Sequence, residues 1–523
     1  MIQRQNRHRQ SLIWRHLAPP PGIAPAGTRA AAGTGDAGRD PAPVQDIQTR
    51  ASAGVHTLVD QQANERLLDY ERRVKAGFDG IEDTLRRISG ESGRQGFAAR
   101  AQQIARRELG FELPERWLRP DGQRGIEVVP LYGYSVFRRF EAFSRDFFEN
   151  DPLAGRGDDA ARARMLDCGF HAMGIAPCSD GRLAHVVSYV LRLPYGLVRR
   201  KAHAGAMFDV SESVRNWVFI EHGRYREGRP NPADQSTRYL KMAVYHYSGS
   251  DPEHQGCAAH GSDTELAAKS ALGRLDAFEE AISNRFCCGA SVAKLLVGLD
   301  TDNDTVRFHL PDAGGGISLA RYIDTGELFD LTQGMSADDA RAFLARRIEH
   351  AAAKSGASAP DDGMRRMLLW LIENNFSQIE YVRRFHWGRY RDIGHAERFV
   401  GVGNGFEEVQ LRNLSYDAFA GTVEEGADDV DVGMTIFRGL NLERGLPVPI
   451  VIRCDYDGQV PGSKVRAETR ARRIERAIHA RYAEESARGM VVTMRTLRDG
   501  CGWEAPGFAE PLLEGLNETE GEA

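Results

Sequence analysis

The sequence has no long hydrophobic run. Its longest purely apolar stretch, Met367–Ile372, is far shorter than the roughly 20 residues that a helix needs to cross a bilayer. The amino end is charged and polar, and it lacks the apolar core of a signal peptide. We therefore expect a protein that is neither secreted nor inserted in a membrane.

Net charge and cysteine are also low. A net charge of -6 over 523 residues leaves no strongly basic body with which to bind nucleic acid. The 7 cysteines, an odd number thinly spread along the chain, do not suggest a disulfide framework. We expect a reducing compartment such as the cytoplasm, where a group of cysteine and histidine residues is typical of metal binding or catalysis.

A length of 523 residues is too great for one hydrophobic core and predicts two to four domains. Residues 1–52 carry several arginines before the first acidic residue, Asp36, and then a tract rich in proline, alanine and glycine. This composition predicts a disordered tail, either untethered or able to fold onto an acidic protein surface. Residues 53–150 have the apolar periodicity of helices and are predicted to form a helical domain.

From residue 151 to residue 397 strand and helix patterns alternate, which predicts an α/β arrangement. The expected strands are 170–176, 239–248, 292–300 and 305–310, and helices are expected near 336–352 and 363–384. Ser262 and Glu265 form a capping box that predicts the start of another helix. The apolar face of that helix is predicted to bury Leu266 and Phe278, among others.

Residues 398–523 repeat this pattern, with strands expected at 399–403, 449–454 and 490–494 and a helix near 464–482. Strand, polar loop and long helix follow one another as they do earlier in the chain. In this second copy Arg453 is expected near the position of His246, and Asn404–Gly405 near that of Cys178. We interpret the segment as a duplicated domain that lacks the chemistry of the first.

Three chemically active side chains alternate directly after an apolar stretch that is predicted to be a strand. They are Cys178, Asp180 and Arg182, and the stretch before them is Met173–Ala176. Open α/β sheets place their active sites at the carboxyl ends of strands, which is where Cys178 would lie. Alternation along an extended chain points the three side chains roughly the same way.

A group of histidine and cysteine residues follows. Cys178, one histidine and Cys257 would give three protein ligands to a catalytic zinc ion and leave the fourth position to water. Two histidines compete for this place. His254 has the short chelating spacing to Cys257, whereas His246 ends a predicted strand, as Cys178 does. The spacing alone leaves both open and names no reaction.

Other candidate sites are weaker. His260, before a glycine, is interpreted as a cap or turn residue, and adjacent Cys287 and Cys288 as reduced buried thiols, because neighbouring side chains rarely chelate one ion. The loop Gly401–Gly405 resembles a phosphate-binding turn only superficially, since the full dinucleotide spacing is missing. A zinc hydrolase is disfavoured because the sequence contains no His-Glu-x-x-His.

The pattern Cys-x-Asp-x-Arg, followed by a strand-terminal histidine and then a cysteine, is similar to the active site of β-class carbonic anhydrases. The wider sequence, from about residue 60 to about residue 490, resembles the carboxysome shell carbonic anhydrase family. Blocks in the same order carry this resemblance: Leu166–Ala172, Pro177–Leu183, Tyr225–Gly228, Ala233–Lys241, Gly256–Ser262, Cys287–Ala293, Ser377–Val382, Asp392–Phe399 and Thr422–Ala427.

The resemblance implies an amino-terminal helical domain (53–150), a catalytic zinc domain (151–397) and a degenerate carboxy-terminal copy of it (398–523). It implies that Cys178, His246 and Cys257 bind one zinc ion per subunit. Asp180 and Arg182 match the catalytic dyad of the family. His395 corresponds to a proposed proton-shuttling histidine.

The implied reaction is the interconversion of CO₂ and bicarbonate by attack of zinc hydroxide on CO₂, with the Asp180–Arg182 pair gating the metal. The resemblance also implies a homodimer or higher oligomer at the inner face of the carboxysome shell in a bacterial cytoplasm. There it would supply CO₂ to Rubisco, and the tail at 1–52 would contact shell proteins or Rubisco. The alternative is a zinc-binding scaffold of the shell that has no catalytic activity.

Overall fold

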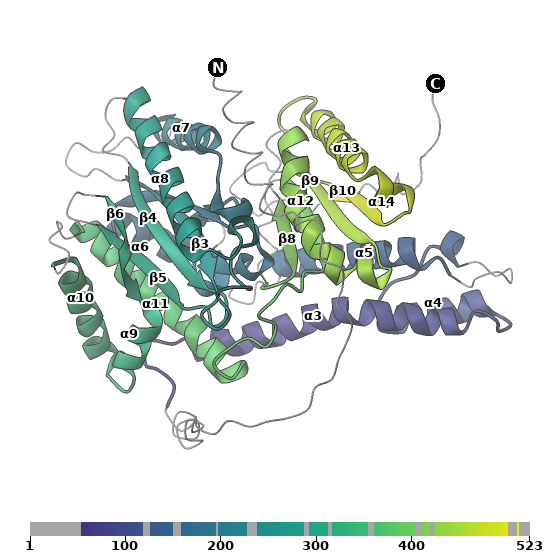
Figure 1. Ribbon diagram of the computed structural model, residues 1–523, viewed down its shortest axis with the longest axis horizontal. Coiled ribbons are helices and arrows are strands. Elements are labelled where there is room, and N and C mark those ends of the chain that lie inside the picture. Colours follow the sequence, from purple (N-terminus) through teal and green to yellow (C-terminus); the bar gives the residue numbers. More distant parts are fainter. Residues whose placement is uncertain are drawn as a thin grey trace, which may run out of the picture.

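The structure is a computed structural model that describes residues 54–118, 126–149, 158–194, 197–226, 238–286, 292–311, 316–353, 360–403, 411–418, 423–499 and 510–511. The predicted tail, the pair Cys287–Cys288 and the turn at Asn404–Gly405 lie outside these residues. None of the described helices is long and apolar enough to cross a membrane. Two sheet-containing parts lie side by side above a long amino-terminal helix (Figure 1).

The amino-terminal part is helical, as predicted. It comprises α3 (Gln61–Gly90), α4 (Phe97–Glu108), the short η1 (Glu115–Trp117) and α5 (Val128–Glu149). The Asp60 carboxylate accepts a hydrogen bond from the Ala63 N–H at 3.0 Å and so caps the start of α3. Phe78 of α3 and Phe140 of α5 both contact the ring of Phe399, so these helices support the second sheet.

The first sheet has the strand order β2-β1-β3-β4-β5-β6. The first four of these are parallel, and β5 and β6 are antiparallel additions at one edge. Strands β1 and β3 are buried along most of their length, as expected for central parallel strands that are covered on both faces. The strands are β1 (Phe170–Pro177), β2 (Val198–Arg200), β3 (Arg238–Tyr247), β4 (Val292–Asp300), β5 (Val306–Pro311) and β6 (Ile317–Asp324).

Helices connect and cover these strands. The longer ones are α6 (Asp158–Asp167), α7 (Val210–Arg226), α8 (Thr264–Phe286), α9 (Thr325–Thr332), α10 (Ala337–Ala353) and α11 (Asp362–Phe385). Short helices η2 (Gly181–Leu183), η3 (Val186–Val190), η5 (Ala204–Ala206) and η6 (Ala258–His260) lie in the loops after the strands. Three of these short helices lie beside the residues that the sequence marked as candidate ligands.

The second sheet has the order β11-β10-β9-β7-β8. From the opposite edge, β8-β7-β9-β10-β11 repeats β2-β1-β3-β4-β5 both in order and in strand direction. The predicted second copy of the domain is therefore confirmed. Its elements are β7 (Phe399–Gly403), β8 (Ser415–Ala418), α12 (Val423–Leu440), η8 (Leu442–Arg444), β9 (Val448–Tyr456), α13 (Ser463–Arg481), α14 (Ala483–Ala487), β10 (Val491–Asp499) and β11 (Glu510–Pro511).

The strand register corrects one detail of the predicted duplication. Val244 of β3 lies opposite the last residue of β1, and Arg453 of β9 lies opposite the last residue of β7. Arg453 therefore corresponds to Val244, and Asp455, two residues later, occupies the position of His246. The prediction for Arg453 was wrong by two residues, a shift that keeps a side chain on the same face of a strand and leaves the apolar pattern unchanged.

The start of α8 also differs from the prediction. The helix begins at Thr264, and the Asp263 carboxylate accepts a hydrogen bond from the Leu266 N–H at 2.9 Å. Ser262 instead has a left-handed backbone conformation (φ 65°) and does not cap the helix. Leu266, which was predicted to be buried, is 47% exposed, whereas Phe278 is buried as expected.

Candidate metal centre

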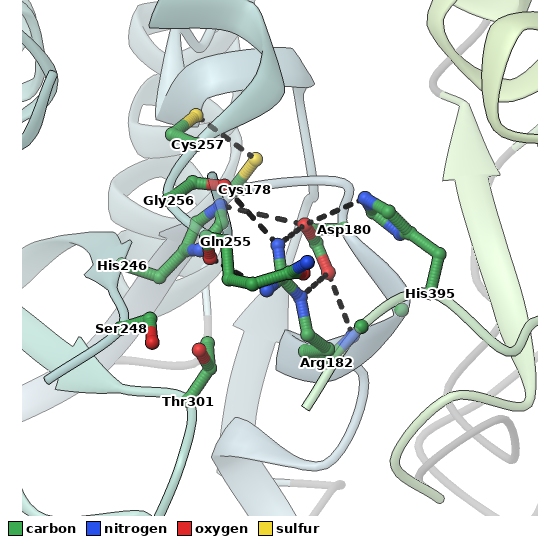
Figure 2. A network of polar contacts seen from close by, with 12 residues as sticks. Cys178, Asp180, Arg182, His246, Ser248, Gln255, Gly256, Cys257, Thr301 and His395 are labelled. Atoms are coloured by element: carbon green, nitrogen blue, oxygen red, sulfur yellow. Dashed lines mark hydrogen bonds and ion pairs between the residues drawn. The ribbon is translucent and has the colours of Figure 1, made fainter. Parts of the chain in front are cut away.

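Two thiols and one imidazole meet at the carboxyl edge of the first sheet. Cys178 directly follows β1, His246 is the penultimate residue of the neighbouring strand β3, and Cys257 precedes η6. One possible ligand atom of each residue lies within 4.8 Å of the others, and the two sulfur atoms are 3.9 Å apart (Figure 2). Parallel neighbouring strands end at the same edge, which explains why residues so far apart in the chain converge here.

These residues fit a bound metal ion. All three are buried, and neither ring nitrogen of His246 has a hydrogen-bond partner among the described residues. A fully buried imidazole without a hydrogen-bond partner is unusual, because buried polar groups are nearly always hydrogen-bonded. Two thiolates and one imidazole form a donor set that is typical of tetrahedral zinc with one open position.

Each sulfur atom also has a neighbouring nitrogen. The Gly205 N–H donates to the Sγ of Cys178 at 3.2 Å, and the Nδ1 of His260 lies 3.4 Å from the Sγ of Cys257. The pKa of Cys178 is lowered, first by its hydrogen bond with Cys257 and then, against the effect of burial, by His246. Neither Gly205 nor the contact of His260 with a sulfur atom was predicted.

The geometry separates the two competing histidines. The ring of His254 is 73% exposed and forms a hydrogen bond with Asp251 at 2.8 Å. It points into the solvent-exposed part of its loop, while His246 is fully buried between the thiols and Asp180. The structure therefore brings His246, and not His254, to Cys178 and Cys257.

Asp180 and Arg182 form a two-point ion pair. The guanidinium Nε donates to Oδ1 at 2.9 Å and Nη2 donates to Oδ2 at 2.7 Å. The remaining hydrogen bonds of the guanidinium go to the backbone carbonyl oxygens of Gln255 (2.6 Å), Gly256 (3.2 Å) and Ile393 (3.2 Å). Arg182 thus ties the loop of Asp180 to the loop that carries Cys257 (Figure 2).

The surroundings keep Asp180 charged. Burial alone would raise the pKa of this carboxyl, but Arg182, His395 and His246 outweigh burial and hold the pKa well below its usual value. Its Oδ2 lies 3.6 Å from the Nε2 of His246 and 3.9 Å from the Nε2 of His395. The carboxylate therefore faces both the ligand group and the second histidine.

His395 lies beside this pair, about a quarter exposed, and has one further partner that the sequence did not reveal. Its Nδ1 is 2.9 Å from the Oε1 of Glu397, whose carboxylate is fully buried. Burial lowers the pKa of His395, but Asp180 and Glu397 more than offset this effect and leave the pKa raised. Glu397 also accepts a hydrogen bond from the N–H of Gly181, which lies 216 residues away in the chain. No local sequence pattern could therefore indicate this role of Glu397.

The fold and the donor set together define an α/β protein with a thiolate-rich candidate metal site beside a carboxylate–guanidinium pair. Three family models match consecutive parts of the chain: the amino-terminal (56–148), catalytic (160–395) and carboxy-terminal (396–506) parts of the carboxysome shell carbonic anhydrase. The chain therefore belongs to the carboxysome shell carbonic anhydrase family, and it is a carbonic anhydrase.

Curated relatives are similar in sequence along most of the chain, and each is named a carboxysome shell carbonic anhydrase. The protein of Hydrogenovibrio crunogenus is 51% identical over 95% of this chain and 96% of its own length. The protein of Prochlorococcus marinus strain MIT 9313 is 48% identical over 86% of this chain and 87% of its own. That of Halothiobacillus neapolitanus is 45% identical over 82% of this chain and 85% of its own.

Proposed function

We propose that Cys178, His246 and Cys257 bind one zinc ion per subunit and that this centre interconverts CO₂ and bicarbonate. The observation that carries the proposal is the fully buried imidazole of His246, which lies beside two thiols and has no hydrogen-bond partner within the described part of the chain. When bound, zinc supplies a Lewis acid that makes water a nucleophile at neutral pH. The donor set leaves a fourth position for that water.

Asp180 and Arg182 would orient the reactants. Arg182 fixes both oxygens of Asp180, so the carboxylate cannot rotate freely towards the ligand group. Asp180 is thereby held as a hydrogen-bond acceptor that faces His246, where it would align the attacking water towards CO₂. In this proposal the Asp180–Arg182 pair also gates the centre, since a carboxylate released from Arg182 could itself become a ligand.

His395 would carry the proton away. CO₂ hydration releases one proton per turnover, and an imidazole is the side chain whose ordinary pKa suits this transfer near neutral pH. The Nε2 of His395 lies 3.9 Å from Asp180, and the ring is only partly buried. It therefore stands between the buried pair and solvent.

In the cell, we infer that the enzyme acts inside the carboxysome, at the inner face of its shell, and supplies CO₂ to Rubisco. The names of its relatives, which refer to the carboxysome shell, support this location. The proposed assembly is a homodimer or higher oligomer. The basic tail at 1–52 is the segment that would contact shell proteins or Rubisco.

The alternative is a zinc scaffold without catalysis. A structural zinc site is closed by four protein ligands, whereas the group of donor atoms that are all close to one another has three members among the described residues, Cys178, His246 and Cys257. This difference favours an open, catalytic site. X-ray absorption of the purified protein would distinguish the two, because four protein ligands and no exchangeable oxygen would support the scaffold.

The decisive experiment is stopped-flow CO₂ hydration with metal analysis of the same sample. We expect one zinc ion per chain and rapid hydration in the wild type. Asp180→Ala, which retains all three proposed ligands, should bind zinc and lose hydration. His254→Ala serves as a control and should leave both unchanged. Full hydration in zinc-loaded Asp180→Ala would contradict the assigned role of Asp180.

A further inference from the structure

The second sheet reaches across to the catalytic loop that follows β1. The backbone N–H of Asp417 donates to the carbonyl oxygen of Ser179 at 3.2 Å. The backbone N–H of Asn413 donates to the carbonyl oxygen of Gly181 at 2.8 Å. Beside them, Arg200 of β2 donates to the buried carboxylate of Asp417 at 2.8 Å. The half of the chain that lacks the ligands therefore holds the loop that carries Cys178.

Glu397 adds a side chain to this contact. Its Oε1 lies 3.2 Å from the Gly181 nitrogen, whose N–H it accepts, and 2.9 Å from the Nδ1 of His395. A Cβ atom at position 181 would lie 2.6 Å from the Cγ of Glu397 and 2.8 Å from the carbonyl oxygen of Ser415. Only glycine permits this close approach. Glu397 is thus pressed against the backbone between Asp180 and Arg182.

The hydrogen bond to Gly181 does not by itself require a charged residue at position 397. Its second oxygen, Oε2, is buried and has no hydrogen-bond partner among the described residues. The amide of a glutamine would accept the Gly181 N–H equally well, without the unfavourable burial of a charge. The charged groups that face His395 are Asp180, Arg182 and Glu397, so the extra carboxylate acts on that ring.

Hydrogen-bond chemistry fixes the form of the ring. When Glu397 is ionised its carboxylate only accepts hydrogen bonds, and the Nδ1 of His395 is then the donor. The single proton of the neutral ring is then held on Nδ1. The Nε2 atom lies 3.9 Å from the Oδ2 of Asp180. In this tautomer Nε2 carries a lone pair and is the atom that can take up a proton.

We propose that Glu397, which lies just before β7 in the part of the chain matched by the carboxy-terminal family model (396–506), is a positioning residue of the carbonic anhydrase site. It holds His395 as the Nδ1-protonated tautomer and anchors Gly181 beneath the Asp180–Arg182 pair. This inference rests on the proposed role of His395 in proton transfer. It gives the second half, which lacks the ligands, a direct part in the chemistry.

The test compares the full-length, zinc-loaded protein with its E397Q variant, which retains an acceptor for Gly181 but no charge. Histidine-selective ¹⁵N NMR would follow the ring of His395, identified by the signal that is missing in H395N. In E397Q we expect the pKa of His395 to fall, because a nearby negative charge is lost. We also expect the preference for the Nδ1-protonated form to weaken, because a neutral amide oxygen is a weaker acceptor than a carboxylate. The pH profile of kcat should move with this titration, while KM and zinc content stay unchanged.

Two further variants complete the design. Glu475→Gln removes another carboxylate of the second half, paired with Arg495 at 3.2 Å, and should leave His395 as in the wild type. E397D keeps the charge and should keep the raised pKa of His395, which covers the case in which E397Q does not fold. An unchanged titration and tautomer of His395 in folded E397Q would overturn the proposal. So would an E397D variant in which His395 titrates as it does in E397Q, because E397D keeps the negative charge. The NMR comparison needs no turnover, so an inactive wild type would refute the proposed function without deciding this inference.

Discussion

The guanidinium of Arg182 grips the carboxylate of Asp180 with two parallel hydrogen bonds, at 2.9 and 2.7 Å, although only one residue separates them in the chain. Both side chains are buried, so each charge is compensated chiefly by the other. Only a planar guanidinium can donate to both oxygens and still reach the carbonyl groups of Gln255 and Gly256. A lysine has neither the geometry nor enough donors.

Arg182→Lys is therefore expected to impair the site although it conserves the charge. We expect the rate of CO₂ hydration to fall by roughly a hundredfold. The free energy of unfolding should fall by about 2–4 kcal/mol, because the buried carboxylate loses its two-point partner. Stopped-flow hydration, zinc analysis and calorimetry would measure these effects. Arg341→Lys, at an exposed pair with Glu373 at 3.2 Å, is the matched control and should be nearly silent. Equal CO₂ hydration by Arg182→Lys and Arg341→Lys would contradict the proposed role of Arg182.

Zinc binding should depend on His246 and not on His254. We expect His246→Ala to lose most of its bound zinc, since only two thiols remain, whereas His254→Ala should retain one ion per chain. Removal of zinc by a chelator should lower the unfolding temperature of the wild type. A ligand present at a thousand times its Kd stabilises the folded state by about 4 kcal/mol. Zinc retained in His246→Ala, or lost in His254→Ala, would reverse the ligand assignment.

Gly181→Ala should disturb the site from the side of the second sheet. The added Cβ would meet the Cγ of Glu397 at 2.6 Å and the backbone carbonyl oxygen of Ser415 at 2.8 Å, and the backbone cannot easily give way. Overpacking of this kind costs roughly 1–3 kcal/mol, and hydration should fall as the loop shifts. Gly273→Ala in α8 has nothing within 4 Å and should instead stabilise the helix by about 0.5–1 kcal/mol. Thermal unfolding and hydration of both variants would check this contrast.

The sequence indicated the ligand group because two simple rules coincide there. Apolar stretches predicted β1 and β3, and parallel neighbours end at the same edge of a sheet, which places Cys178 near His246. Spacing alone could not choose between His246 and His254, because it cannot tell whether a loop residue faces the sheet or the solvent, and the family resemblance pointed to His246. Burial favours the same residue: the ring of His246 is fully buried and that of His254 is 73% exposed.

What the sequence could not predict depends on contacts between distant segments. Glu397 and Gly181 meet across 216 residues, through two halves whose packing leaves no periodic signal. The edge strands β2 and β8 are too short for alternation to reveal them, yet β8 covers the catalytic loop. The predicted capping box at Ser262 was wrong for a local reason. The carboxylate of the adjacent Asp263 caps the helix instead, by accepting a hydrogen bond from the Leu266 N–H.

A buried carboxylate also couples the amino-terminal helices to the catalytic half in a pH-dependent way. Glu71 of α3 accepts hydrogen bonds from Lys75 and from the hydroxyl of Tyr381 on α11. Burial would raise its pKa, but Lys75 and Tyr381 outweigh burial and lower it from 4.5 to about 2. Because the folded-state pKa is the lower one, the stabilisation is complete above about pH 4.5 and is lost as the pH falls towards 2.

Glu71→Gln should remove this contribution, which is on the order of 3 kcal/mol for a shift of this size. At pH 7 we expect the variant to unfold at a clearly lower temperature than the wild type. Between pH 5 and pH 3 the gap should narrow, because the wild-type carboxylate is progressively protonated in the unfolded state. Glu65→Gln, at an exposed hydrogen bond with Gln61, is the matched control and should change the unfolding temperature little at pH 7. A difference in unfolding temperature between wild type and Glu71→Gln that stays constant down to pH 3 would mean that Lys75 and Tyr381 do not lower the pKa of Glu71 in the folded protein.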